Sequence, residues 1–280
     1  IYWSAQGGLL EKEYVFFEGN NLRERFSKQK ILTIFEFGFG AGLNFFLTWK
    51  KVQDLKPKAQ VQFFSIEKYP LPLTLVEEVL NKEENLYGLR DEFLAFYKNI
   101  STGYNQFTAA NAKLELILII ADVNDLVNSF HAKIDVWYLD GFSPAKNPEM
   151  WSKEIFSFMK KNSKKGASFS TYTTAGFVRE GLTDVGFVVE KFPGFGNKKH
   201  MLKGFLPIIR QTISDKPWFR IPKTNFKSKR VVVIGSGLAG TSLAFALSQK
   251  GFSITLVERE SEISSGASGN PAGMFAPLLT

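Results

Sequence analysis

A glycine-rich turn between a strand and a helix constrains this chain more than any other feature. The turn reads Glu-Phe-Gly-Phe-Gly-Ala-Gly from Glu36 to Gly42, between the apolar run 31–35 and the helical pattern of 43–49. Glycine at every second position allows backbone angles that other residues avoid, and it lets a ligand approach the backbone closely. The segment therefore predicts a strand–turn–helix unit of an α/β domain, with a cofactor lying against the turn.

The spacing of the glycines indicates which cofactor. A phosphate loop would end in Gly-Lys-Ser or Gly-Lys-Thr, and a dinucleotide fingerprint would read G-x-G-x-x-G. Here the pattern is G-x-G-x-G, and the acidic Glu36 precedes it. S-adenosylmethionine carries a sulfonium and no pyrophosphate, so a carboxylate beside the turn is tolerated. We predict that Gly38, Gly40, Gly42 and Asn44 bind this cofactor, while Glu36 organises the loop or meets the methionine ammonium; a glycine turn without a ligand is the alternative.

Three more acids follow apolar runs that read as strands. Glu67 follows 61–66, Asp122 follows 116–120 and Asp140 follows 134–139. Ligands of open α/β sheets lie beyond the carboxyl ends of the strands. We therefore predict that Glu67 binds the ribose hydroxyls, that Asp122 meets the adenine amino group and that Asp140 faces the reacting centre. The alternatives are a solvated Glu67 and aspartates that only cap turns.

Composition excludes several kinds of site. The 280 residues include no cysteine, so disulfides, cysteine-ligated zinc and thiolate catalysis are excluded. With only His131 and His200, we expect no metal site. There is no apolar run of about 18 residues, so we expect no membrane span, and the lack of cysteine suits a cytoplasmic location.

The chain carries a net charge of +8, and its lysines and arginines cluster in the ranges 160–165, 191–203 and 216–230. Such clusters together favour a band that binds an RNA backbone. Solvated lysine-rich faces are the alternative for each cluster taken separately.

The pattern of elements predicts two domains. Residues 1–212 are expected to form a Rossmann-like α/β methyltransferase domain with an N-terminal extension, followed by a basic linker over 213–229. Within the first domain we expect a strand near 14–17, a helical insert over 70–100 and an edge strand over 201–206.

Residues 230–280 change character. The strand 230–234 leads into Gly235, Gly237 and Gly240 in G-x-G-x-x-G spacing, then a helix, then a second strand that ends at Glu258. This is a dinucleotide fingerprint in its strand–turn–helix–strand context, with the pyrophosphate at the helix N-terminus and Glu258 on a ribose. The small-residue loop 264–270 favours FAD. Because only fifty residues follow Arg230, we expect the first βαβ unit of an incomplete FAD domain that does not hold FAD tightly by itself.

A longer segment gives the chain a family resemblance. Residues 139–151 read Leu-Asp-Gly-Phe-Ser-Pro-Ala-Lys-Asn-Pro-Glu-Met-Trp, and with 36–45, 65–70, 174–179 and 194–199 they resemble the bacterial tRNA 5-methylaminomethyl-2-thiouridine biosynthesis bifunctional proteins. The resemblance implies two reactions on the wobble uridine in the anticodon of tRNA. An FAD-dependent part removes the carboxymethyl group from 5-carboxymethylaminomethyl-2-thiouridine, and the methyltransferase then methylates the resulting amine.

With this resemblance, each remaining candidate residue receives a role. We expect Asp140 to orient the amine and accept its proton, and we expect Phe142 on the cofactor side and Pro144 on the substrate side to wall the pocket. Four basic residues are candidates for tRNA phosphate contacts: Lys146, Arg179, Lys198 and Lys199. A small-molecule N-methyltransferase and an inactive RNA-binding module with a methyltransferase fold are the alternatives.

Overall fold

The computed structural model describes residues 8–83, 86–111, 113–141, 144–207 and 228–270. The chain divides into two compact units, Ile1–Arg210 and Gln211–Thr280. Phe142 and all but the last two residues of the expected linker 213–229 lie outside the described residues.

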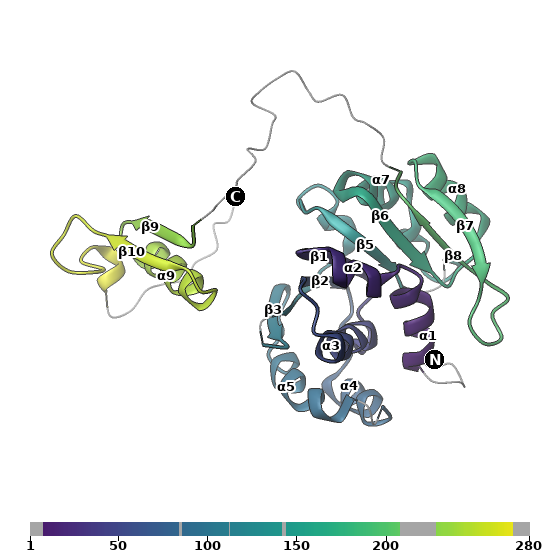
Figure 1. Ribbon diagram of the computed structural model, residues 1–280, viewed down its shortest axis with the longest axis horizontal. Helices are drawn as coiled ribbons and strands as arrows, with labels where there is room; N and C mark the ends of the chain where they lie inside the picture. The colour runs from purple at the N-terminus through teal and green to yellow at the C-terminus, as the bar shows by residue number, and fades with distance from the viewer. Residues whose placement is uncertain (1–7, 84–85, 112, 142–143, 208–227, 271–280) are drawn as a thin grey trace, which may run out of the picture. The chain divides into compact units, whose positions relative to one another are not determined.

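The first unit is built on an eight-stranded sheet in the order β3-β4-β2-β1-β5-β6-β8-β7 (Figure 1). The strands β4, β2, β1, β5 and β6 run parallel, while β3 and β8 pair antiparallel with their neighbours. The bounds are β1 Ile31–Phe37, β2 Gln60–Glu67, β3 Gly103–Ala109, β4 Leu114–Ile120, β5 Ile134–Leu139, β6 Ser163–Thr171, β7 Val188–Pro193 and β8 His200–Phe205. All four strands that we expect to carry the acids are therefore neighbours with their carboxyl ends at one edge.

Helices cover both faces of this sheet (Figure 1). One face carries α1 Gly8–Lys12, the π-helix η1 Glu13–Glu18, α2 Leu22–Lys28, α3 Leu43–Leu55, α4 Leu73–Asn81 and α5 Tyr87–Tyr97. The other carries α6 Val123–Leu126, the 3-10 turn η3 Pro148–Trp151, α7 Lys153–Asn162 and α8 Gly176–Asp184. Since both faces are covered, β1 and β5 are almost wholly buried, which explains why they read as continuous apolar runs.

The alternating direction of the side chains along β1 and β5 decides which of them point toward α3. Side chains of successive strand residues point to opposite faces. Ile34, Val136 and Tyr138 pack in the core on the α3 side, whereas Phe35 and Trp137 pack on the α7 side. Glu36 and Asp140 continue the first series, so both carboxyl groups point toward the start of α3.

Two expectations about single elements are wrong. Residues 14–17 lie in η1 rather than in a strand, and Val15, Phe16 and Phe17 are all buried. A short apolar run does not distinguish a buried helix from a strand by periodicity alone, and here it packs on the sheet face. Residues 200–205 form an interior strand and not an edge strand, because β8 lies between β6 and β7 and pairs with both. The expected helical insert 70–100 is confirmed as α4 and α5, while β3 had no sequence prediction.

The second unit contains a two-stranded parallel sheet of β9 Arg230–Ile234 and β10 Ser253–Val257, connected by α9 Leu238–Gln249 and followed by the 3-10 turn η5 Ala267–Gly269. This βαβ unit matches the expected fingerprint context. It leaves large apolar side chains exposed, including Ile234 at 86% and Phe245 at 68%.

Candidate active site

The glycine turn after β1 adopts the left-handed backbone that the sequence led us to expect. Gly38, Gly40 and Gly42 have φ values of 85°, 54° and 80°, a region that costs other residues free energy. A Cβ at Gly38 would lie 3.1 Å from the Cα of Gly141, and one at Gly42 would lie 2.7 Å from the ring of Phe39. The turn therefore presents bare backbone beside the end of β5.

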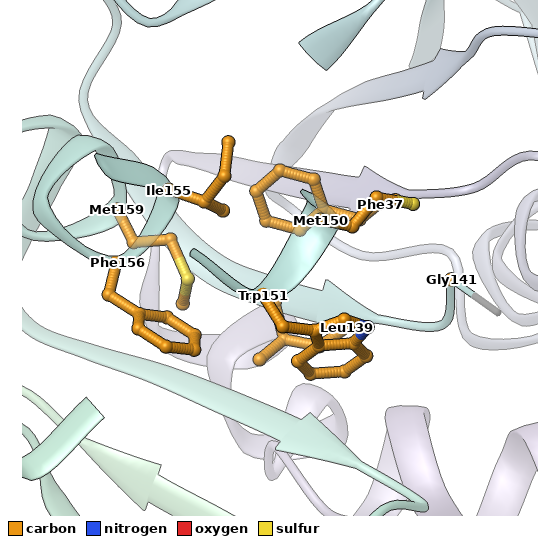
Figure 2. Close-up of a pocket in the computed structure, with 8 residues that line it drawn as sticks. All are labelled: Phe37, Leu139, Gly141, Met150, Trp151, Ile155, Phe156 and Met159. Atoms are coloured by element: carbon orange, nitrogen blue, oxygen red, sulfur yellow. The ribbon is translucent and has the colours of Figure 1, made fainter. Parts of the chain in front are cut away.

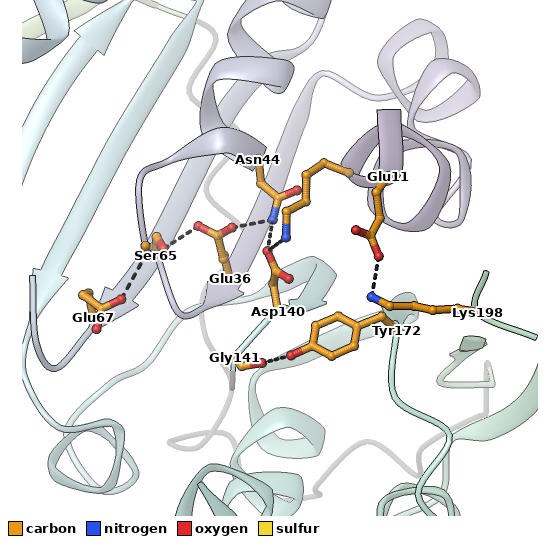
Figure 3. Close-up of polar contacts among 11 residues, drawn as sticks. Glu11, Glu36, Asn44, Ser65, Glu67, Asp140, Gly141, Tyr172 and Lys198 are labelled. Atoms are coloured by element: carbon orange, nitrogen blue, oxygen red, sulfur yellow. Dashed lines mark hydrogen bonds and ion pairs between the residues drawn. The ribbon is translucent and has the colours of Figure 1, made fainter. Parts of the chain in front are cut away.

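Glu36 is fixed by its strand register and lies buried at 1% exposure. It pairs in register with Ser65 of β2, whose hydroxyl donates to Oε2 at 2.6 Å, and the amide of Asn44 donates to Oε1 at 2.7 Å (Figure 3). Burial, and then the neighbouring charge of Asp140, raises the pKa of Glu36 to about 8. Both oxygens are occupied by protein donors, which favours the loop-organising role over an ammonium contact.

Asp140 follows β5, and its side chain is 10% exposed. Its Oδ2 accepts from Asn44 Nδ2 at 2.8 Å and from the ammonium of Lys12 in α1. Asn44 thus bridges the two carboxyl groups with its two amide hydrogens (Figure 3). Burial raises the pKa of Asp140, and the Lys12 ammonium opposes that rise.

Glu67 and Asp122 complete the row of acids but make different contacts. Glu67 Oε2 accepts from the backbone N–H of Gly40 at 3.1 Å, and its Oε1 accepts from that of Tyr69 at 3.0 Å, so it ties β2 to the glycine turn. Asp122 caps α6 through the N–H of Asn124 and pairs with Lys68 at 2.7 Å. That ion pair is the main reason why the pKa of Asp122 is lowered.

One buried atom at this site lacks a partner. Asn44 is 2% exposed, and its Oδ1 accepts no hydrogen bond among the described residues. The amide must point its NH2 group at the two carboxyl groups, so the oxygen is left facing away from them. A buried acceptor without a donor is costly, and both S-adenosylmethionine and an amine substrate carry N–H donors. The left-handed glycine turn and this acceptor therefore fit the expected cofactor and an amine beside it.

A second set of contacts closes the same edge of the sheet. Glu11 of α1 pairs with Lys198 at 2.5 Å, the Lys198 ammonium lies 4.5 Å from the ring centroid of Tyr172, and the Tyr172 hydroxyl donates to the carbonyl of Gly141 (Figure 3). These contacts join the N-terminal segment, the β7–β8 loop and the turn after β5. Lys198 is thus engaged within the site, in addition to any phosphate contact.

The other predicted substrate residues lie at different depths. Pro144 is buried, whereas Lys146, Arg179 and Lys199 are exposed. Behind Gly141 a small pocket is lined with apolar side chains, among them Leu139, Met150 and Trp151 (Figure 2). A Cβ at position 141 would lie 2.8 Å from Met150 Cε, so the glycine lets the turn pack closely on η3.

In the second unit the dinucleotide residues form their own turn. Gly235 has a φ of 93°, and a Cβ at Gly240 would lie 1.9 Å from the carbonyl oxygen of Gly235, so only glycine allows this packing. Glu258 accepts from the backbone N–H and the hydroxyl of Ser236 at 2.7 and 2.6 Å, which lowers the pKa of Glu258 to about 2. The first backbone N–H of α9 donates to Ser268 Oγ at 3.0 Å, where the fingerprint predicts a pyrophosphate.

Comparisons with known proteins show which families the two parts of the chain resemble. Residues 84–207 match the family model described as S-adenosyl-L-methionine-dependent methyltransferase, and residues 230–280 match FAD dependent oxidoreductase. The chain is 39% identical to the tRNA 5-methylaminomethyl-2-thiouridine biosynthesis bifunctional protein MnmC of Stutzerimonas stutzeri, over 98% of this chain and 42% of that protein. It is 38% identical to the MnmC of Leptospira interrogans, over 100% of this chain and 44% of the relative. The chain belongs to this family and matches part of the length of these members.

The family resemblance and the two cofactor classes are thereby confirmed, and the chain spans less than half the length of these relatives. Among solved structures, MNMC2 of Aquifex aeolicus superimposes with a TM-score of 0.57 at 24% identity, covering 73% of this chain and 63% of that one. This match confirms the Rossmann-like methyltransferase fold.

Sequence reasoning missed Glu11, Lys12, Ser65 and Tyr172. Ser65 carried a usable signal, since it is the register partner of Glu36 on the neighbouring strand. The other three carried none, because they come from segments whose packing on the site edge follows only from the tertiary fold. Among the described residues, no helix is long and apolar enough to cross a membrane, and no group of three or more potential ligands could hold a metal ion.

Proposed function

We propose that the first unit transfers a methyl group from S-adenosylmethionine to the amine of 5-aminomethyl-2-thiouridine in tRNA, giving 5-methylaminomethyl-2-thiouridine. In the longer protein, the FAD-dependent part would first remove the carboxymethyl group from 5-carboxymethylaminomethyl-2-thiouridine. A cytoplasmic location belongs to this proposal. The observation that carries it is the buried Asp140–Asn44–Glu36 cluster beside the left-handed glycine turn.

Each residue of the cluster has a part in this reaction. The cofactor supplies an activated methyl group on a sulfonium, so the protein mainly has to align the reactants. Gly38 and Gly40 lie half-buried and would meet the cofactor, Gly42 closes the turn against Phe39, and Glu67 shapes the turn through Gly40. Asn44 holds the carboxyl group of Asp140 in place and offers Oδ1 to an N–H donor. Asp140 then orients the substrate amine and accepts a proton.

The exposed basic residues support an RNA substrate. Lys146, Arg179 and Lys199 are free to meet phosphates, and Lys198 lies at the rim of the site. Together with the net charge of +8, they favour a polyanion over a small neutral substrate. The modified uridine follows the printed name of the relatives, whereas the wobble position of the anticodon is what the family resemblance implies.

The experiment compares methyl incorporation into tRNA carrying 5-aminomethyl-2-thiouridine with incorporation into unmodified tRNA. We expect incorporation only into the first, falling steeply with added salt. Asp140→Asn should slow methyl transfer at least 100-fold, since general acid–base groups contribute about 10²–10⁴-fold, while cofactor affinity stays within a few-fold. Equal labelling of both tRNAs, or near-normal turnover by the Asp140→Asn variant, would refute the proposal.

A further inference from the structure

The chain's own lysine lies on the carboxyl group that is proposed to receive the substrate amine. Lys12 Nζ donates to Oδ2 of Asp140, with the two side chains 20% and 10% exposed. Oδ2 also accepts from Asn44. Since both donors share one oxygen, Oδ1 is the side of Asp140 left for a substrate.

This arrangement bears on a difficulty of amine methylation. An alkylamine is mostly protonated at neutral pH, and only its neutral form has the lone pair that attacks the methyl group. An unpaired buried carboxylate would stabilise the ammonium form, because an opposite charge nearby favours protonation. Asp140 alone would therefore hold the substrate in its unreactive state.

The other titratable groups around Asp140 do not cancel its charge. Glu36 of β1 and Glu11 of α1 are acidic, and Tyr172 after β6 is an uncharged phenol whose pKa is raised by burial. Lys198 from the β7–β8 loop is paired with Glu11. Lys12 is thus the cation that contacts Asp140 directly among the described residues.

We propose that Lys12 is a positioning residue that neutralises the charge of Asp140, so that the substrate amine binds to Oδ1 as the neutral, nucleophilic form. This inference rests on the proposed function. The amine lone pair forms the new N–C bond, the C–S bond breaks with its electron pair going to sulfur, and the product ammonium then loses a proton to Asp140 or solvent. Lys12 keeps its proton throughout.

The fold supplies a matched control. Lys51 of α3 pairs with Glu13 on the same N-terminal segment, and its ammonium lies 5.5 Å from the ring centroid of Phe17. Lys12 lies 5.3 Å from the centroid of Phe16. The two lysines thus anchor the same segment with similar contacts, and only Lys12 reaches Asp140.

The test is the pH profile of methyl transfer by the whole 280-residue chain and three variants, Lys12→Met, Lys12→Arg and Lys51→Met, with 5-aminomethyl-2-thiouridine tRNA from pH 6 to 10. A charge removed about 6 Å from the amine should shift the amine's pKa by about 2 units at an effective dielectric constant near 20. We expect the acid limb of kcat/KM for Lys12→Met to move up by at least about one pH unit, with the rate recovering at high pH. Lys12→Arg and Lys51→Met should keep the original profile.

Three results would overturn the inference. If Lys12→Met lowers the methyl-transfer rate by the same factor at every pH, the role of Lys12 is structural. Circular dichroism and cofactor calorimetry on each variant check folding directly. A faster Lys12→Met with a lower KM would show that Lys12 competes with the substrate. An unshifted profile alongside an active unaltered chain refutes this inference alone, whereas no methylation by the unaltered chain refutes the proposed function and this inference with it.

Discussion

Replacing Glu36 by glutamine should change how the stability of the first unit depends on pH. Glu36 is a buried carboxyl group whose pKa rises from an ordinary 4.5 to about 8, and glutamine keeps its shape without titrating. Between these two pH values the folded chain holds a proton that the unfolded chain has released. The contribution of Glu36 to the free energy of unfolding is therefore fully present below about pH 4.5, and it is lost as the pH rises through 8.

The size of the effect follows from that pKa. At 1.36 kcal/mol for each pH unit, the rise from 4.5 to about 8 corresponds to at most about 5 kcal/mol. Between pH 5 and pH 7 the free energy of unfolding of the unaltered chain should fall by about 2–3 kcal/mol because of Glu36. The Glu36→Gln variant should lose none of this, so its stability relative to the unaltered chain should grow over that range.

Urea unfolding without cofactor, followed by tryptophan fluorescence at each pH from 5 to 9, measures the difference. Four of the five tryptophans lie within residues 1–210, and Trp49 and Trp137 are buried there, so the signal reports the first unit. Glu78→Gln is the control, because Glu78 lies on the surface and its pKa is lowered by Lys82. Its stability difference should stay flat over this pH range.

A stability difference for Glu36→Gln that does not change between pH 5 and pH 8 would refute the reasoning. It would mean that Glu36 stays ionised in the folded chain, with Asn44 and Ser65 compensating for its burial. If the stability of Glu36→Gln relative to the unaltered chain instead fell as the pH rose, the coupling between Glu36 protonation and folding would have the opposite sign.

Three other predictions concern the cofactor turns. Glu67→Ala removes the acceptor for the Gly40 N–H and should weaken S-adenosylmethionine binding at least tenfold, and an unchanged affinity by calorimetry would remove its ribose role. Gly42→Ala places an alanine at a φ of 80° with its Cβ against the Phe39 ring. It should therefore lower the free energy of unfolding, measured in urea, by about 1–3 kcal/mol. The control Gly88→Ala lies in α5 with open space around it and should be neutral or stabilising; equal effects would contradict the strain argument. The second unit, with its exposed apolar side chains, should bind no FAD tightly, and flavin absorbance that co-purifies with this chain would prove this wrong.

Sequence patterns were sufficient where the chemistry is local. The alternation of glycines after Ile34 and Phe35 predicted the turn, and three left-handed glycines occur there. The fold class was also predictable, because buried parallel strands separated by helices read as apolar runs and amphipathic segments. The four acids were assigned to one edge because parallel strands end on the same side, and the sheet order makes their strands neighbours. Their binding roles remain predictions.

Elements whose conformation depends on distant partners were not predictable. Val15 to Phe17 became a π-helix because the sheet face and α3 bury all three side chains, and nothing in the run itself distinguishes this from a strand. The position of β8 between β6 and β7 depends on which edge receives the last hairpin.

The sequence by itself determined the two glycine turns, the acid after each central strand and the family, since each depends on residues near one another in the chain. Only the tertiary structure decided that Lys12 and Asp140, 128 positions apart, share a hydrogen bond, and that Asn44 bridges two carboxyl groups. Strand alternation and sheet order fix which side chains meet, and burial then sets their pKa values. Those contacts carry the proposed chemistry of the site.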